Sequence, residues 1–162
     1  RCKVDLNGDI LEKVDGSSFA HGAINRKNGL VATADRGGGS NIWLYTIDGV
    51  LVRKLTHHKF NGDNRIMDIQ WLNDKEILFT MSNYGLMNLH IETKKVATLI
   101  QGCNQNSYQF FSVSPDGREI LIDRRDVKYI CLCADRPTSI KYESKIYRYN
   151  VGSRRIYRVT EF

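Results

Sequence analysis

Three short apolar segments lie close together between residues 30 and 56: Leu30-Val-Ala-Thr-Ala-Asp-Arg36, Ile42-Trp-Leu-Tyr-Thr-Ile-Asp-Gly49 and Leu51-Val-Arg-Lys-Leu-Thr56. The same plan recurs as Ile77-Leu-Phe-Thr-Met-Ser-Asn83, Leu86-Met-Asn-Leu-His-Ile91 and Val96-Ala-Thr-Leu-Ile100. Leu30 and Ile77 are 47 residues apart, and Ile77 and Ile120 are 43 residues apart. A period of roughly 45 residues with four short strands per repeat is typical of propeller blades. The sequence therefore predicts an all-β fold of β-propeller blades.

We expect residues 1–162 to form one partial propeller domain of about three and a half four-stranded antiparallel blades. The predicted blades span residues 2–15 (half a blade), 18–56, 65–100 and 108–160, and the last carries an insertion near 125–142. The insertion is either an extra hairpin or a partner-binding arm. Complete rings typically have ~4–8 blades, and we expect this chain to be part of a propeller of about six to eight blades, because open sheet edges invite pairing. We therefore expect further blades in a longer protein, or closure by a second copy in a homodimer.

One turn motif in the third predicted blade identifies a family resemblance. The segment is Ser112-Val-Ser-Pro-Asp-Gly-Arg-Glu-Ile-Leu-Ile-Asp123, in which Pro115, Asp116 and Gly117 suit a tight turn between two strands. A degraded form follows Gln70 and Trp71 in the second blade, and Arg53-Lys-Leu-Thr-His57 precedes it. These motifs resemble TolB-like β-propeller repeats. The dipeptides typical of the related tryptophan–aspartate repeats are absent from the sequence.

The resemblance implies a non-catalytic propeller module that binds a protein or another ligand. It also leaves an enzyme's propeller open, either the gate of a prolyl-oligopeptidase-type peptidase or part of an oligogalacturonate-lyase-like enzyme acting on acidic sugars. No Gly-x-Ser-x-Gly nucleophile elbow occurs in the sequence, so no hydrolase domain is expected within these residues. Because the TolB-like proteins include periplasmic members, a periplasmic or extracellular location is slightly favoured.

The positive charge of the chain is concentrated in its last third. The net charge is +6, and residues 124–158 hold ten Lys or Arg against Asp126, Asp135 and Glu143. Such a surface could bind nucleic acid or an acidic partner. The same charges would also arise if Lys and Arg simply occupied the solvated faces of strands. No apolar run approaches the ~18 residues of a membrane span.

The candidate binding residues occupy the predicted loops of one propeller face, where function is usually found. They are Arg36, His57, His58, Asn83, Tyr84, Arg124 and Arg125. His57 and His58 are weak candidates for metal ligands, since a solvated loop explains them better. Arg124 and Arg125 could together hold a carboxylate or a sulfate. No cofactor is predicted.

Two further features leave alternatives open. Gly37-Gly38-Gly39 could admit a phosphate, but a flexible blade loop accounts for it without one. The four cysteines, Cys2, Cys103, Cys131 and Cys133, form no C-x-x-C motif and fit either a reducing or an oxidising compartment. We expect them to be buried thiols.

Overall fold

The computed structural model describes residues 2–4, 10–13, 19–35, 41–57, 65–82, 84–102, 106–130 and 139–159. These residues form fourteen strands, and no helix occurs among them. The first two strands pair as a two-stranded sheet: β1 (Cys2–Val4) and β2 (Ile10–Lys13). No helix in this described part is long and apolar enough to cross a membrane.

The other twelve strands form three antiparallel sheets of four strands each, paired in chain order. The first sheet consists of β3 (Phe19–Asn25), β4 (Leu30–Asp35), β5 (Ile42–Thr46) and β6 (Leu51–Lys54). The second consists of β7 (Ile66–Trp71), β8 (Glu76–Met81), β9 (Gly85–His90) and β10 (Val96–Gln101). The third consists of β11 (Asn106–Val113), β12 (Glu119–Ile130), β13 (Ser139–Asn150) and β14 (Arg155–Arg158). The predicted all-β fold of four-stranded antiparallel blades is confirmed.

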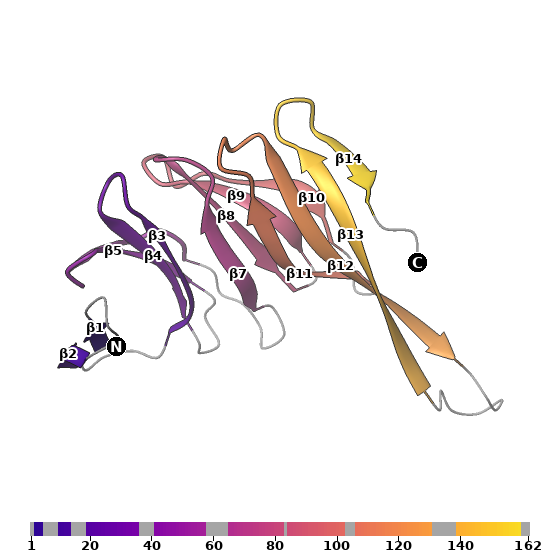
Figure 1. Cartoon of the computed structure of the whole chain (residues 1–162), viewed down its shortest axis with the longest axis horizontal. Coiled ribbons are helices and arrows are strands. Elements are labelled where there is room, and N and C mark those ends of the chain that lie inside the picture. Colours follow the sequence, from indigo (N-terminus) through magenta and orange to yellow (C-terminus); the bar gives the residue numbers. More distant parts are fainter. Residues whose placement is uncertain are drawn as a thin grey trace.

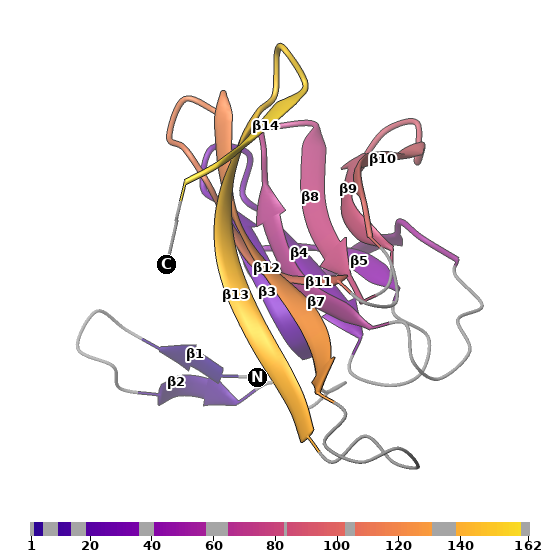
Figure 2. The ribbon, with the colours of Figure 1, turned by 90° about the vertical axis from the view of Figure 1, so that its right-hand side faces the viewer.

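The three sheets stack side by side, with their first strands β3, β7 and β11 next to one another (Figures 1 and 2). One apolar cluster lies between the first and second sheets and includes Ala32, Leu44, Ile77 and Phe79. A second cluster lies between the second and third sheets and includes Leu78, Leu86, Ile120 and Ile122. Because side chains alternate along a strand, β8 sends Ile77 and Phe79 to one cluster and Leu78 to the other. Its apolar run is thus explained by burial on both faces.

The strand pairing shows that the first repeat is offset by one residue from the sequence-based alignment of Leu30 with Ile77 and Ile120. Ile24 pairs with Val31, Trp71 with Ile77, and Val113 with Ile120. Val31 therefore holds the position of Ile77 and Ile120, although Leu30 aligns with them by eye. Leu30, Glu76 and Glu119 each begin the second strand of their sheet, and the alignment by eye misplaces the first sheet because Leu30 is apolar where the other two sheets have glutamate.

Side chains of β7 complete the hydrogen bonding of the innermost strands on either side. The Asp68 carboxylate accepts a hydrogen bond from the Phe111 backbone N–H at 3.2 Å. The Gln70 amide donates to the Phe111 carbonyl and accepts from the Val113 N–H at 3.3 Å. On the other side, Trp71 Nε1 donates to the Ala23 carbonyl at 3.0 Å. These bonds link β7 to both neighbouring blades and satisfy backbone groups that sheet pairing leaves free.

The insertion near 125–142 lengthens the central hairpin of the third sheet. β12 and β13 pair continuously from Glu119↔Asn150 to Ile130↔Ser139, whereas the pairing of β11 with β12 ends at Asn106↔Asp126. Residues 127–130 and 139–142 therefore form a two-stranded extension, which we call the arm. It projects beyond the stacked sheets (Figure 1).

Candidate functional site

The chain topology places several candidate residues at one end of the stacked sheets. In each antiparallel sheet, the connection between the second and third strands lies at the same end as the connections between sheets. We call this the loop end; it carries His57, Tyr84 and the arm. Arg36, His58 and Asn83 lie outside the described residues, so their roles stay predictions.

Tyr84 is fixed by a close backbone contact below it. Its carbonyl accepts a hydrogen bond from the Gly102 N–H at 2.8 Å, and its side chain is 40% exposed. At Gly85, with φ of 103°, an added Cβ would lie 2.0 Å from the Ile100 carbonyl oxygen. Glycine is therefore required beside Tyr84, and the close contact with residues 100–102 holds the Tyr84 backbone in place.

His57 is exposed at the end of the first sheet. Within the described part of the chain, no group of three His, Cys, Asp or Glu side chains is placed to hold a metal ion. Metal binding at His57 and His58 thus stays a prediction.

A network of charged side chains stands at the base of the arm. Asp126 accepts hydrogen bonds from Arg124 Nε and from Lys145 Nζ, each at 2.8 Å. Lys145 also lies 3.3 Å from the Glu143 carboxylate, and Arg124 lies over the Tyr147 ring at 5.6 Å. The side chains of Arg124, Asp126 and Lys145 are only 27%, 16% and 18% exposed. The network therefore fixes the arm at the point where β11, the first strand of the third sheet, begins.

The same contacts set the protonation of these groups. Burial tends to raise the pKa of Asp126, but the hydrogen bonds from Lys145 and Arg124 outweigh it and lower that pKa below its usual value. The hydrogen bond to Asp126 is the main cause that raises the pKa of Lys145. For Arg124, burial opposes the charge, and the contact with Asp126 nevertheless raises the pKa. All three groups stay charged around neutral pH.

Arg124 and Arg125 do not come together as a two-armed anion site. Both lie within β12 rather than in a loop, and consecutive residues of a strand point to opposite faces. Arg124 faces Asp126 and Tyr147. Arg125 points to the opposite face of the sheet, and its partner in the strand register is Ser144 of β13. Among the described residues Arg125 has no ion-pair partner, so it is the better candidate to meet an external anion.

Asp126, Glu143 and Lys145 are members of this site that the sequence did not predict. Arg124 and Asp126 are two residues apart, and their common face follows from strand periodicity. Lys145 could be added only with the register of the hairpin, in which Arg124 stands opposite Lys145. That register was hidden because the ends of the insertion show no turn motif as plain as Pro115-Asp116-Gly117.

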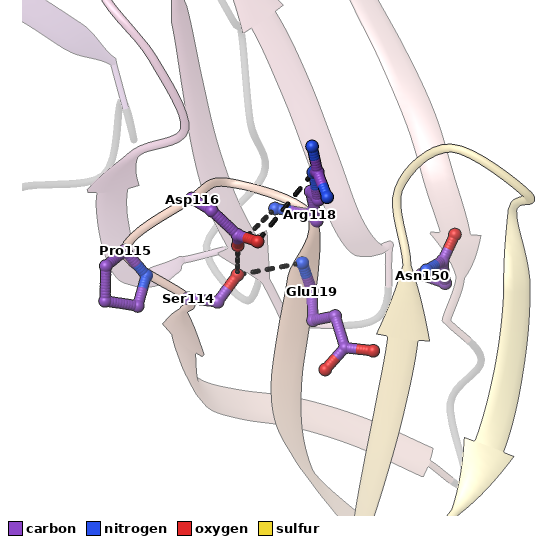
Figure 3. A pocket seen from close by; sticks show the side chains of 6 residues that line it. All are labelled: Ser114, Pro115, Asp116, Arg118, Glu119 and Asn150. Carbon is purple, nitrogen blue, oxygen red and sulfur yellow. Dashed lines mark hydrogen bonds and ion pairs between the residues drawn. The ribbon is translucent and has the colours of Figure 1, made fainter.

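A cavity of about 410 Å³ lies at the opposite end of the third sheet, around the turn that carries the family resemblance (Figure 3). Ser114 Oγ donates to Asp116 Oδ1 at 2.6 Å, and the Arg118 N–H donates to the same oxygen at 3.1 Å. The Glu119 N–H donates to Ser114 Oγ at 2.9 Å. The hydrogen bond from Ser114, followed by that from Arg118, lowers the pKa of Asp116. These polar groups hold the turn itself, which gives the motif a structural role.

Comparison with known proteins supports the fold. No family model and no curated protein matches the chain. It resembles the tricorn protease structure with a TM-score of 0.61 and 14% identity, over 91% of this chain and 13% of that one. It also resembles an oligogalacturonate lyase in complex with manganese, with a TM-score of 0.59 and 10% identity, over 88% of this chain and 39% of that one. A third is an oligogalacturonate lyase from Vibrio parahaemolyticus, with a TM-score of 0.56 and 12% identity over the same shares.

The sheets described here are β-propeller blades. This chain spans 13% of the tricorn protease chain and 39% of each lyase chain. At identities of 10–14% the likeness concerns the fold alone.

Proposed function

We propose that this chain is a TolB-like, non-catalytic propeller module that binds an acidic protein surface at its loop end. The observation that supports the proposal is the arm, a paired extension of β12 and β13 that projects past the sheets and begins beside Arg125. A two-stranded extension adds little to the blade core but adds surface for a partner. The excess of Lys and Arg in residues 124–158 favours a partner of negative charge.

The internal network supports the same proposal. Arg124 and Lys145 are engaged by Asp126 and Glu143, which orders the base of the arm before any partner arrives. A preordered surface loses less conformational entropy on binding than a flexible one. Arg125, on the other face of β12, is then available to contact a carboxylate.

Binding of three labelled polyanions would test this proposal: poly-glutamate, a single-stranded RNA and oligogalacturonate, each measured by fluorescence anisotropy. We expect poly-glutamate to bind, with affinity falling as salt rises, and Arg125→Gln to weaken it about fivefold, a loss of ~1 kcal/mol. Arg118→Gln is the matched control, since Arg118 is an exposed arginine at the opposite end of the third sheet. Its binding should match that of the unmodified chain.

Other outcomes would assign the alternatives. Preference for RNA over poly-glutamate would favour a nucleic-acid binder. Accumulation of an unsaturated product from oligogalacturonate, detected by its ultraviolet absorbance, would favour a lyase. Equal effects of Arg125→Gln and Arg118→Gln on poly-glutamate binding would contradict a site at the loop end.

A further inference from the structure

The outer face of the third sheet exposes apolar side chains at positions that are buried in the other two sheets. Leu121 is 47% exposed and Ile146 is 41% exposed. The pairing register makes Leu121 equivalent to Leu78, and Ile146 equivalent to Leu86. Leu78 and Leu86 are both fully buried beneath the third sheet. The exposed face of the third sheet, which we call the open face, is thus the same surface that elsewhere receives a following blade.

The first sheet shows the same correspondence. Its equivalents of Leu121 and Ile146 are Ala32 and Ile42, which are fully buried against the second sheet. Two successive sheets therefore cover these positions in the same way. The open face continues that pattern, and its other apolar members are Phe110, Tyr157 and Val159.

β11, the innermost strand of the third sheet, carries a polar side chain at the position where β7 uses Gln70 to bond the next sheet. Gln70 bonds the backbone of β11, and Ser112 takes the equivalent place on β11 because Ser112 pairs with Leu121 as Gln70 pairs with Leu78. Ser112 is exposed. An innermost strand of another blade, laid beside β11, would bring backbone groups toward this hydroxyl.

We propose that the open face is the docking surface of a further four-stranded propeller blade. The blade it fits presents aliphatic or aromatic side chains at the positions of Ile77 and Phe79, as the second sheet does toward the first. Arg148 on the open face lies 3.7 Å from Glu119 and over the Tyr157 ring at 5.6 Å. Arg148 pairs in register with both Leu121 and Tyr157, so the partner blade meets an apolar surface that contains an arginine–glutamate ion pair.

This surface adjoins the loop-end site of the proposed function, because Arg125 lies on the same face of β12 as Leu121 and nearer to the arm. It consists of the sheet face from Leu121 to Tyr157, whereas the loop-end site lies where Arg125 enters the arm. A variant at Leu121 therefore distinguishes the two proposals.

A cysteine probe measures whether a further blade covers the open face. Leu121→Cys is made in the full chain and in an extended chain, in which a second copy of residues 65–102 follows Phe162. Thiol labelling at position 121 is followed by peptide mass analysis, which separates it from the four natural cysteines. We expect labelling to slow at least tenfold in the extended chain, because the appended blade can pack as the second sheet packs on the first.

Two controls define the result. Leu51→Cys reports on β6, where Leu51 is 50% exposed, and its labelling should not change. Placing Ile77→Lys and Phe79→Lys in the appended copy alone should restore fast labelling at position 121. Unchanged labelling with the unmodified extension would overturn the proposal. Labelling in the unextended chain that slows as its concentration rises would also overturn it, by assigning the open face to a second copy.

Discussion

Asp126 is the residue on which the charges at the base of the arm converge. It receives two short hydrogen bonds from cations while its own side chain is 16% exposed. A carboxylate placed in this way is stabilised in its charged form, and its partners are in turn stabilised in theirs. Removing it leaves Arg124 and Lys145 beside each other without their shared counter-charge, and a partly buried pair of like charges is unfavourable.

The lowered pKa of Asp126 predicts how this network depends on pH. Because the pKa is lower in the folded chain, the stabilisation is complete above the ordinary carboxyl pKa of about 4 and is lost as the pH falls below it. We expect Asp126→Asn to lower Tm by about 4 °C at pH 7. The difference in free energy of unfolding from the unmodified chain should shrink between pH 4.5 and pH 3, as measured by urea unfolding.

Asp74 and Asp116 also have lowered pKa values, so their contributions to the stability of the fold are lost in the same pH range. They are present in both proteins, so their contributions cancel when the two curves are subtracted. A difference that stays constant from pH 7 to pH 3 would contradict the role given to Asp126.

At the scale of strands, β7 joins the sheets on both sides of it. Asp68 and Gln70 bond β11, and Trp71 bonds β3. These side chains stand in for a strand-to-strand ladder, because β3, β7 and β11 belong to different sheets. The position of each blade relative to the next thus depends on polar side chains as well as on apolar packing.

Replacing Gln70 tests this linkage. Gln70→Leu keeps most of the side-chain volume but leaves the Phe111 carbonyl and the Val113 N–H without their partner. We expect the free energy of unfolding to fall by about 1–3 kcal/mol and the Val113 amide to exchange faster. Trp71→Phe removes one bond at the other blade junction and should leave Val113 exchange unchanged, as hydrogen-exchange mass spectrometry would show. Unchanged protection of Val113 in Gln70→Leu would contradict the linkage.

The same strands show what the sequence could and could not predict. The strand type, the four-strand repeat and the turn at Pro115-Asp116-Gly117 follow from local chemistry. The pairing of β4 does not, since both Leu30 and Val31 are apolar and the local sequence does not decide between them. β8 carries no two-residue alternation because both of its faces are buried. The charged network could not be predicted, because it joins residues 19 positions apart through an unknown hairpin register.

At the scale of the whole molecule, the apolar cores lie between blades rather than within them. Leu121 and Ile122 are neighbours in β12, yet Ile122 is fully buried between the second and third sheets while Leu121 stands on the open face. Adjacent residues of similar size therefore differ only in whether a blade covers them.

Alanine substitutions at Leu121 and Ile122 compare the stability contributed by an uncovered and a covered position of the same strand. We expect Ile122→Ala to lower the free energy of unfolding by about 2–5 kcal/mol, since it removes methyl groups from a filled core. Leu121→Ala should cost less than about 1 kcal/mol in the same urea unfolding experiment. In the extended chain described above, Leu121→Ala should become as costly as a core substitution. Equal costs for the two substitutions in the unextended chain would contradict the assignment of the open face.

The burial of β8 on both faces also determines which part of the chain opens most readily. Each sheet gains its stability from contact with adjacent sheets, as in linear repeat proteins, so the contribution of a sheet depends on how many neighbours it has. The second sheet has a neighbour on each side, whereas the third is covered on one described side only. Thermal fluctuations therefore favour fraying that starts at the first or the third sheet, each of which has one described neighbouring sheet, and that reaches the second sheet last; the third sheet is the one that carries the arm. A partner bound to the arm would suppress fraying of the third sheet. Binding of the partner would therefore lengthen the time for which the three sheets stay folded.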